Sequence, residues 1–374
     1  MSAGLPTDER GARVALSRLG EPGSLGLHEA VAHWGAVEAL QRLVRGTEAV
    51  PGAIAERFSS NQLADDLRHA DRLEARVVIP SDPQWPWAVD DLAVPPLCLW
   101  VLGPADLDAA STRSVAVVGA RSATAYGTQV AADLSAGLCD RGFTIVSGAA
   151  FGIDAAAHRG ALAVDGCTVA VLAGGIDRLY PSSHTRLLHE IAHTGAVVTE
   201  QPLGVAPIGS RFLSRNRIIA ALASGTVVVE ASLRSGSLNT AGHATKIHRP
   251  VAAVPGPVTS TQSAGCHQLV RDKGAALVTD ADEVADLVGR IGLDLAPEKR
   301  GAPRPSDDLD PADRTLFEVL PIRGHADIPT LARAASLTTR AVRAGLGRLA
   351  TRGDAVTDGL DGWRKAPANT QGGR

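Results

Sequence analysis

The fold is decided by one stretch of the chain, which runs Ser114-Val-Ala-Val-Val-Gly-Ala-Arg-Ser-Ala-Thr-Ala-Tyr-Gly127. It begins with a short apolar, β-branched run, passes through a turn of small residues, and continues into a segment in which we expect a helix near Tyr126. An apolar strand, a small-residue turn and a helix make up the βα unit of parallel sheets. Such a turn offers backbone N–H groups and a positive helix end to a phosphate.

The same pattern recurs from Ser114 to about Ile291, where short apolar runs alternate with helical segments of roughly a dozen residues. The predicted strands are Val115–Val118, Thr144–Ser147, Thr168–Leu172, Ala196–Thr199, Thr226–Val229, Val251–Val254 and Ala276–Val278. Nearly all-apolar strands are typical of sheets that helices cover on both faces, with a site at the carboxyl ends of the strands. The sequence therefore predicts an α/β fold with a Rossmann-like, doubly wound, mainly parallel sheet.

Two regions precede this pattern. Residues 1–75 contain leucines and other apolar residues at helical spacing, which predicts a small helical N-terminal module. The stretch from Asp82 to Gly103 is rich in proline and tryptophan and ends in an apolar run compatible with a strand. We expect it to pack onto the sheet, so that an extended Rossmann-like domain covers residues 76–291.

The end of the chain has a different composition. Residues 292–309 have the proline and charge content of a solvated linker. Residues 310–374 contain three helical segments followed by Ala355–Trp363, a stretch compatible with a hairpin. This order predicts a winged-helix-like domain with a flexible tail.

Length and composition exclude several classes of protein. The 374 residues exceed one ordinary domain, and the formal net charge of −3 argues against a surface coated in basic patches. No run reaches the roughly 18 apolar residues of a membrane helix, and residues 1–10 do not resemble a leader, so we expect a cytoplasmic protein without a membrane partner. The four cysteines form no Cys-x-x-Cys pair; we expect reduced thiols, with a zinc site as the alternative, and no cofactor.

Three small-residue turns follow predicted strands on the same sheet edge. Their candidate phosphate-binding residues are Gly119, Arg121, Ser122, Ser147, Gly148, Ser235, Gly236 and Ser237. The first turn is not a dinucleotide fingerprint, because Arg121 stands where a pyrophosphate needs bare backbone. We interpret Arg121 as a phosphate clamp; the alternative is a side chain that caps the sheet edge or pairs with a carboxylate.

The region from Gly209 to Arg249 is a basic island in an acidic chain. Its cations are Arg211, Arg215, Arg217, Arg234, Lys246 and Arg249, and its one acid is Glu230, so that the local charge is 6 − 1 = +5. Phe212 and Asn216 lie among the arginines, and an aromatic residue beside arginines is the combination that stacks a base while holding phosphates. The alternative places Phe212 in the core and the arginines on a solvated helix face.

We find no catalytic constellation in these motifs. Asp154 and His158 are four residues apart on a predicted helix face, but no nucleophile accompanies them, and we expect structural roles for both. The turns lack a Walker lysine and a cluster of metal-binding carboxylates. The sequence therefore favours binding without catalysis.

Six motifs in order resemble the DNA-processing protein A (DprA/Smf) family. They are Gly119–Gly127, Ser147–Asp154, Glu200–Gly204, Arg215–Leu222, Glu230–Leu238 and Val254–Gly256. The resemblance implies a homodimeric protein that binds single-stranded DNA, loads RecA recombinase onto strands covered by single-strand-binding protein, and acts in natural transformation and DNA processing.

The resemblance also implies roles for particular residues. Arg121 would clamp phosphate, Phe212 would stack on a base, Arg215 and Arg217 would line the basic pocket, and Asn216 would hold the turn. Three positions depart from the family: Gly209 stands where relatives often carry a lysine, for which Arg211 is a substitute, and His184 and His267 stand where asparagine is common.

Two alternatives remain. A Rossmann-like nucleoside monophosphate phosphoribohydrolase uses similar turns, but it needs a catalytic glutamate near the position of Asn239. A duplex-reading role for the end of the chain would place Arg340, Arg343 and Arg348 on a recognition helix. Asp354, Asp358 and Asp361 crowd the predicted wing and argue against that role.

Overall fold

The computed structural model describes residues 4–51, 53–299 and 306–367. The chain divides into two compact units, Met1–Pro297 and Glu298–Arg374. No helix in the described residues is both long and apolar enough to cross a membrane.

The first unit is built on one sheet. Nine strands of its described residues pair in the order β1-β2-β6-β5-β4-β3-β7-β8-β9. β1 and β2 are antiparallel, as are β2 and β6, and all other neighbours are parallel. The strands are β1 (Ala75–Val78), β2 (Leu99–Leu102), β3 (Ser114–Val118), β4 (Thr144–Ser147), β5 (Thr168–Val171), β6 (Ala196–Thr199), β7 (Gly225–Val228), β8 (Val251–Ala253) and β9 (Ala276–Leu277). The predicted Rossmann-like, mainly parallel sheet is confirmed.

Helices cover both faces of this sheet. α6, α7 and α12 pack on one face, around Val115, Val117 and Ile145. α5, α9, α10 and α11 pack on the other face, around Ala116, Val118 and Val146. The helices are α5 (Leu107–Thr112), α6 (Ala125–Asp140), α7 (Ile153–Leu162), α8 (Thr185–Thr194), α9 (Gly209–Leu222), α10 (Ser237–Lys246), α11 (Ala264–Lys273) and α12 (Ala281–Val288), with a short 3-10 helix, η3 (Ser182–His184), before α8. Successive residues of each buried strand point to opposite faces, so most positions in the strand are apolar, and the buried serines and threonines lie mainly at strand ends.

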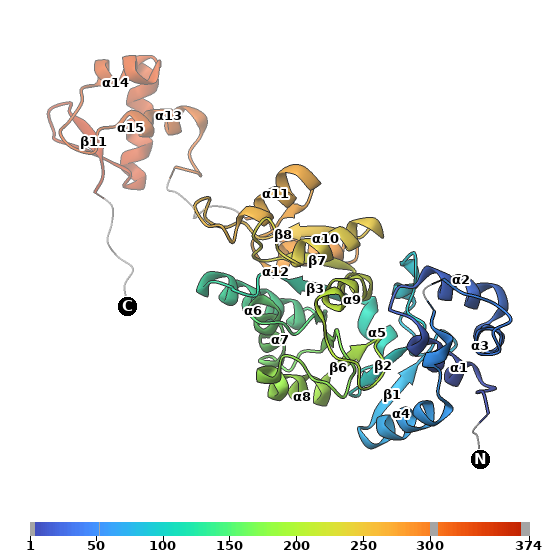
Figure 1. Cartoon of the computed structure of the whole chain (residues 1–374). Helices are drawn as coiled ribbons and strands as arrows, with labels where there is room; N and C mark the ends of the chain where they lie inside the picture. The colour runs from blue at the N-terminus through green and yellow to red at the C-terminus, as the bar shows by residue number, and fades with distance from the viewer. Residues whose placement is uncertain (1–3, 52, 300–305, 368–374) are drawn as a thin grey trace. The chain divides into compact units, whose positions relative to one another are not determined.

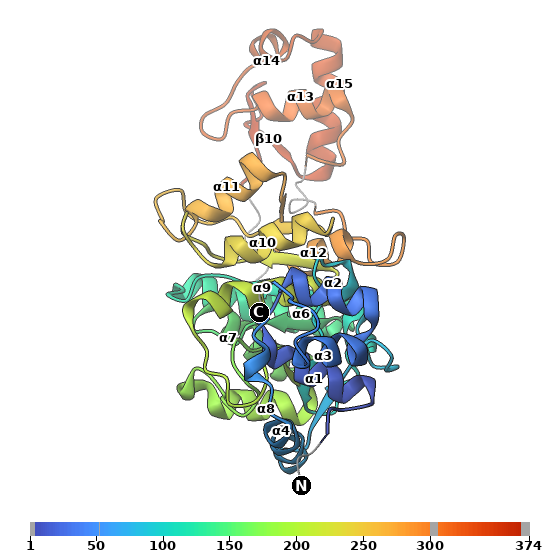
Figure 2. The ribbon, with the colours of Figure 1, turned by 45° about the vertical axis from the view of Figure 1, so that its right-hand side comes forward.

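The N-terminal helices gather at the β1–β2 end of the sheet, where α1, α2 and α3 form one cluster (Figures 1 and 2). The elements of this region are α1 (Glu9–Leu19), α2 (Leu25–Trp34), α3 (Ala36–Val44), η1 (Ala55–Arg57), α4 (Ser60–Arg72) and η2 (Trp87–Asp91). Leu16 and Leu40 share a hydrophobic core with Trp100 and Val197 of the sheet. The N-terminal helices therefore pack against the sheet within the same unit.

Strand β1 has no counterpart among the predicted strands. It contains Arg76, whose charge hides the strand pattern in the sequence. The Arg76 guanidinium donates to Gln84 and to the Ala105 carbonyl, so the charged side chain is bonded at the edge of the sheet. The predicted run before Gly103 does form a strand, β2.

The order in which the strands are added creates a crevice at the edge of the sheet, between β3 and β7. From β3 the chain adds β4, β5 and β6 on one side, and α9 then carries it back to β7 on the other side of β3. The loops after β3 and β7 therefore leave in opposite directions. In sheets of this kind ligands bind at such a switch point, outside the carboxyl ends of the strands.

The second unit has its own hydrophobic core, which includes Leu316, Leu331 and Leu346. It consists of α13 (Pro311–Val319), α14 (Ile328–Ala335), α15 (Thr339–Arg352) and a hairpin of β10 (Ala355–Thr357) and β11 (Trp363–Lys365). The winged-helix assignment and the four-part domain division remain predictions. Part of the predicted linker, residues 300–305, and the predicted tail, residues 368–374, lie outside the described residues.

Candidate functional site

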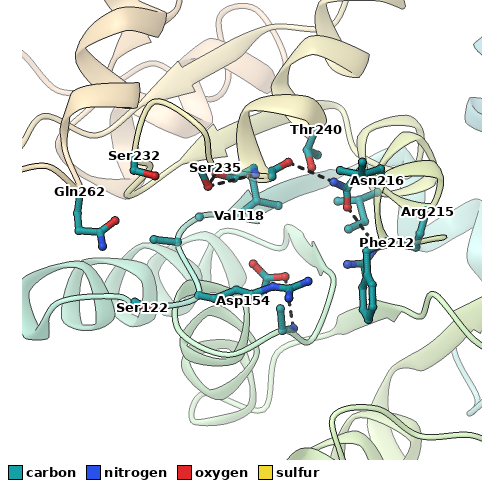
Figure 3. A pocket seen from close by; sticks show the side chains of 18 residues that line it. Val118, Ser122, Asp154, Phe212, Arg215, Asn216, Ser232, Ser235, Thr240 and Gln262 are labelled. Carbon is teal, nitrogen blue, oxygen red and sulfur yellow. Dashed lines mark hydrogen bonds between the residues drawn. The ribbon is translucent and has the colours of Figure 1, made fainter. Parts of the chain in front are cut away.

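A pocket of about 380 Å³ lies at the switch point. Its walls come from the turn after β3, the start of α7, the first half of α9, the start of α10 and Gln262. Figure 3 shows Ser122 and Asp154 on one side of the pocket and Ser232, Ser235 and Thr240 on the other. Because all these elements begin or end at the carboxyl edge of the sheet, the pocket occupies the position that the strand pattern predicts.

Arg121 and Phe212 form the mouth of the pocket. The guanidinium carbon of Arg121 lies 5.0 Å from the centroid of the Phe212 ring, which is a cation–π contact. Arg121 is exposed, and no carboxylate in the described part of the chain forms an ion pair with it. The structure therefore does not support the alternative in which Arg121 pairs with a carboxylate. The guanidinium of Arg121 is available to an anionic ligand.

Arg215 is a buried cation in the wall of the pocket, with only 5% of its surface exposed. Its Nη1 atom donates to the carbonyl of Gly148 at 2.9 Å and to that of Val171. The pKa of Arg215 is lowered to about 10, chiefly by burial; the charge of Asp154 opposes this shift and the charge of Arg121 adds to it. In the described residues no carboxylate lies within 4.0 Å of this guanidinium, so an anion in the pocket would offset an otherwise costly buried charge.

Asp154 moderates that charge. Its Oδ2 atom accepts hydrogen bonds from the backbone N–H groups of Gly148 and Ala150, at 3.2 and 3.4 Å. Burial raises the pKa of this carboxyl group, while the charge of Arg215 lowers it. The sequence-based expectation of a structural role for Asp154 agrees with its backbone contacts, although the residue also lines the pocket.

The start of α10 brings two hydroxyl groups to the pocket. Gly236 is the N-cap residue and has no side chain to cap the helix, and the Ser235 hydroxyl accepts a hydrogen bond from the N–H of Ser237 at 3.4 Å. The hydroxyl oxygens of Ser235 and Ser237 lie 2.7 Å apart at this end. Hydroxyl groups at the positive end of a helix are suited to binding a phosphate.

The start of α6 is different from our prediction. Thr124 caps the helix, and its N–H and hydroxyl donate to the two carboxylate oxygens of Glu230 at 2.9 and 2.6 Å. Glu230 follows β7, and the sequence around Tyr126 gives no sign of it. The predicted free helix end after the first turn is therefore already occupied by a carboxylate.

Two predicted phosphate ligands do not reach the pocket. Ser147 is fully buried, and its hydroxyl donates to the carbonyl of Val117 at 2.7 Å inside the sheet. Gly148 is also buried, and a Cβ atom there would lie 2.5 Å from the guanidinium nitrogens of Arg215. Both residues lie behind the wall of the pocket, and neither lines it.

The structure contradicts the predicted charge of the basic island, residues 209–249. Arg211 pairs with Glu21 at 2.8 Å, Arg217 pairs with the buried Glu200, and Arg249 pairs with Asp91 at 2.8 Å. Arg217 also donates to the carbonyl of Val94, away from the pocket. The local charge of +5 is therefore wrong as a description of the surface, and Arg211 and Arg217 do not line the pocket.

The remaining predicted residues do lie at the site. Gly119, Arg121, Ser122, Phe212, Arg215, Asn216, Ser235, Gly236 and Ser237 line the pocket. Asn216 donates to the carbonyl of Gly236 at 3.2 Å and to Asn239 at 3.3 Å, and so holds the start of α10 in place. Gln262 was missed, because nothing in the loop after β8 distinguishes it in the sequence.

Of the groups considered for catalysis, Asp154 lines the pocket, whereas His158 and Asn239 are held by other contacts. Burial lowers the pKa of His158 to about 3, and its Nδ1 atom lies 2.7 Å from the Thr168 hydroxyl. Asn239 bonds to Asn216 and supplies no carboxylate. Among the described residues, no three histidine, cysteine, aspartate or glutamate side chains are grouped as a metal site would require.

The fold and the pocket define a Rossmann-like α/β protein with a cationic, hydroxyl-rich site and an aromatic residue at its switch point. The sequence model of one family, described as DNA recombination-mediator protein A, matches residues 76–289. The chain belongs to this family, and the family predicted from the six motifs is confirmed.

Relatives extend this result over most of the chain. A DNA processing protein DprA of Mycobacterium tuberculosis is 49% identical over 340 residues, which cover 86% of each chain. The X-ray structure of DNA processing protein A from Streptococcus pneumoniae matches with a TM-score of 0.65 and 31% identity, over 74% of this chain and 96% of that one. DNA processing protein A from Helicobacter pylori, whose structure is described as giving insight into a single-stranded DNA binding mode, matches with a TM-score of 0.52 and 28% identity, over 57% and 95%.

Proposed function

We propose that this chain binds single-stranded DNA in the switch-point pocket and acts as a recombination mediator that loads RecA recombinase onto the bound strand. The observation that carries the proposal is the arrangement of Arg121, Phe212 and Arg215. An exposed cation lies on an aromatic ring at the mouth of a pocket, and a buried cation that forms no ion pair within 4.0 Å in the described residues lies in its wall.

The chemistry of the pocket supports a nucleotide as the ligand. Arg121 and Arg215 offer positive charge to a phosphate, and the hydroxyls of Ser235 and Ser237 at the start of α10 offer hydrogen bonds. The Phe212 ring offers a face on which a base can stack. A base within a duplex already stacks on its neighbours, so this combination favours an unpaired strand.

The family supports the finer parts of the proposal. We infer that the protein forms a homodimer, acts on strands covered by single-strand-binding protein, and serves natural transformation where the host takes up DNA. We further infer that it works in the cytoplasm and binds DNA without chemical turnover. Its Helicobacter pylori relative is described as a single-stranded DNA binder, which supports the choice of ligand.

Fluorescence anisotropy tests the binding step, with labelled single-stranded and duplex oligonucleotides across a salt series. We expect tighter binding to single strands, and we expect Arg121→Ala to weaken it and to reduce the salt dependence by about 0.7 for each lost phosphate contact. Phe212→Ala should weaken it about 5-fold or more. Arg186→Ala is the matched control, because Arg186 is 93% exposed and pairs with Glu190 on α8. Equal weak binding to both DNA forms, unchanged by Arg121→Ala, would contradict the proposal.

The loading step needs its own measurement. RecA filament growth on a strand covered by single-strand-binding protein should accelerate when the wild-type chain is added. Phe212→Ala should remove the acceleration in proportion to its loss of binding. Normal DNA binding with no acceleration would reject the mediator role and leave the binding role intact.

A further inference from the structure

A second aromatic side chain lies against Phe212. The ring centroid of Tyr180 is 5.6 Å from that of Phe212, and the two rings are tilted by 56°. Tyr180 belongs to the loop between β5 and η3, and it is 47% exposed. Because β5 lies beside β4 in the parallel sheet, this loop leaves from the same edge as the pocket.

A cation accompanies this ring. Arg178 stands two residues before Tyr180, is exposed, and forms no ion pair in the described part of the chain. Its backbone N–H donates to the carbonyl of Gly175 at 2.9 Å, which fixes the turn that presents it. This loop therefore carries an exposed cation and an exposed aromatic ring two residues apart.

The neighbouring loop extends the aromatic surface. Phe151, after β4, lies 4.8 Å from the ring of His184, between ring centroids, and is also about half exposed. His184 is buried, and its Nδ1 atom lies 3.0 Å from the carbonyl of Ala149, which holds the ring in place. In a chain with only two tyrosines and five phenylalanines, the exposure of these rings along one sheet edge marks a surface for planar ligands.

We propose that Tyr180 stacks on a second base of the strand and that Arg178 contacts its phosphate, so that single-stranded DNA leaves the switch-point pocket along the loop after β5. This inference rests on the proposed function and adds a direction to it. The strand passes from Phe212 to Tyr180, away from β7 and toward the side of the sheet that holds β5 and β6. Stacking accepts any base, so the second position reads no sequence.

A length series tests this path. Oligonucleotides of increasing length are titrated against the wild type and against Tyr180→Ala, Tyr180→Trp and Arg178→Ala. We expect Tyr180→Ala to leave the shortest bound strands unaffected and to weaken longer strands about 5- to 100-fold, whereas Tyr180→Trp retains affinity. Arg178→Ala should lower the salt dependence for long strands only.

Two controls separate this path from general effects. Trp87→Ala removes an exposed ring from η2, and Arg186→Ala removes an exposed cation from α8; neither should change binding. Thermal unfolding of each variant checks that the loop change has not unfolded the protein. An equal loss for short and long strands with Tyr180→Ala would show that Tyr180 only supports Phe212, and would overturn the second position.

Photocrosslinking gives a direct readout. A strand carrying 5-iodouracil at successive positions is irradiated with the wild-type protein, and the crosslinked peptide is identified by mass spectrometry. We expect one position to crosslink to Phe212 and a nearby one to Tyr180. Crosslinks to Phe212 without any to residues 177–184 would overturn this path and leave the proposed function standing, whereas no binding by the wild type would reject the proposed function itself.

Discussion

Glu21 accepts two hydrogen bonds from the guanidinium of Arg211, at 2.8 and 3.0 Å. The first residue follows α1, and the second lies in the first turn of α9, directly before Phe212. An acid from the N-terminal region thus both neutralises a cation near the mouth of the pocket and fixes the position of the turn that carries the aromatic ring. The pair also lowers the pKa of Glu21.

Glu21→Gln should therefore release the charge of Arg211. We expect single-stranded DNA to bind about 2- to 5-fold more tightly, because one more cation becomes available to a phosphate. Anisotropy across a salt series measures the change, and the salt dependence should increase. Glu29→Gln is the control, because it removes the same charge from an exposed position on α2. An equal gain from both variants would assign the effect to net charge.

Gly209→Lys should strengthen binding as well. Gly209 is the first residue of α9, is exposed, and has open space where a Cβ would stand. A side chain here lies three residues before Phe212 and on the same helix face. We expect the salt dependence of binding to rise by about 0.7. Ser210→Lys, one residue further on and on another face, should give a smaller change; equal effects would contradict a contact specific to this face.

Gly148→Ala should disturb the pocket by displacing the side chain of Arg215. The added Cβ would meet the guanidinium of Arg215, which must then leave the carbonyl of Gly148. We expect a loss of single-stranded DNA binding together with a fall of about 1–3 kcal/mol in the free energy of unfolding. Urea unfolding and anisotropy measure the two effects. Gly242→Ala, at an exposed position inside α10 with open space, should leave binding unchanged and raise the free energy of unfolding by about 0.5–1 kcal/mol.

His158 should make the protein sensitive to acid. The Thr168 hydroxyl donates to the carbonyl of Ile145, so it must accept from the Nδ1–H of a neutral imidazole. Burial lowers the pKa of this group from 6.5 to about 3. Below pH 6.5 the unfolded chain binds a proton that the folded protein does not, so stability present above this pH is lost as the pH falls.

His158→Asn should reduce this loss. Between about pH 6.5 and about pH 5 the wild type should lose roughly 2 kcal/mol more of its free energy of unfolding than the variant. Urea unfolding at both pH values measures the difference, whatever the absolute stability of the variant. His189→Asn, on the exposed part of α8, is the control. The same pH dependence in wild type and His158→Asn would contradict a buried neutral imidazole.

The sheet and the position of the pocket follow from local sequence. Runs such as Val115–Val118 must be apolar on both faces because helices cover both, and each predicted strand lies within one residue of an observed one. The turns after β3 and β7 then meet at one edge by topology alone. Arg121 was found for this reason, and Phe212 was found because it stands among arginines at a predicted helix start.

The charge of the site could not be predicted from local sequence. The acids that neutralise Arg211, Arg249 and Arg217 lie 190, 158 and 17 residues away along the chain. A count of charges within a window of sequence excludes such partners, and only packing brings them together. The contact of Tyr180 with Phe212 was missed for the same reason.

The neutralised arginines also affect the rate at which the protein associates with DNA. A chain with a net charge of −3, and with three cations of its basic island held by acids, does not attract a polyanion over long distances. Encounter with a strand is then limited by orientation rather than accelerated by the electrostatic field. Differences in affinity between variants of Arg121, Phe212 and Arg215 should therefore arise from how long the strand remains bound.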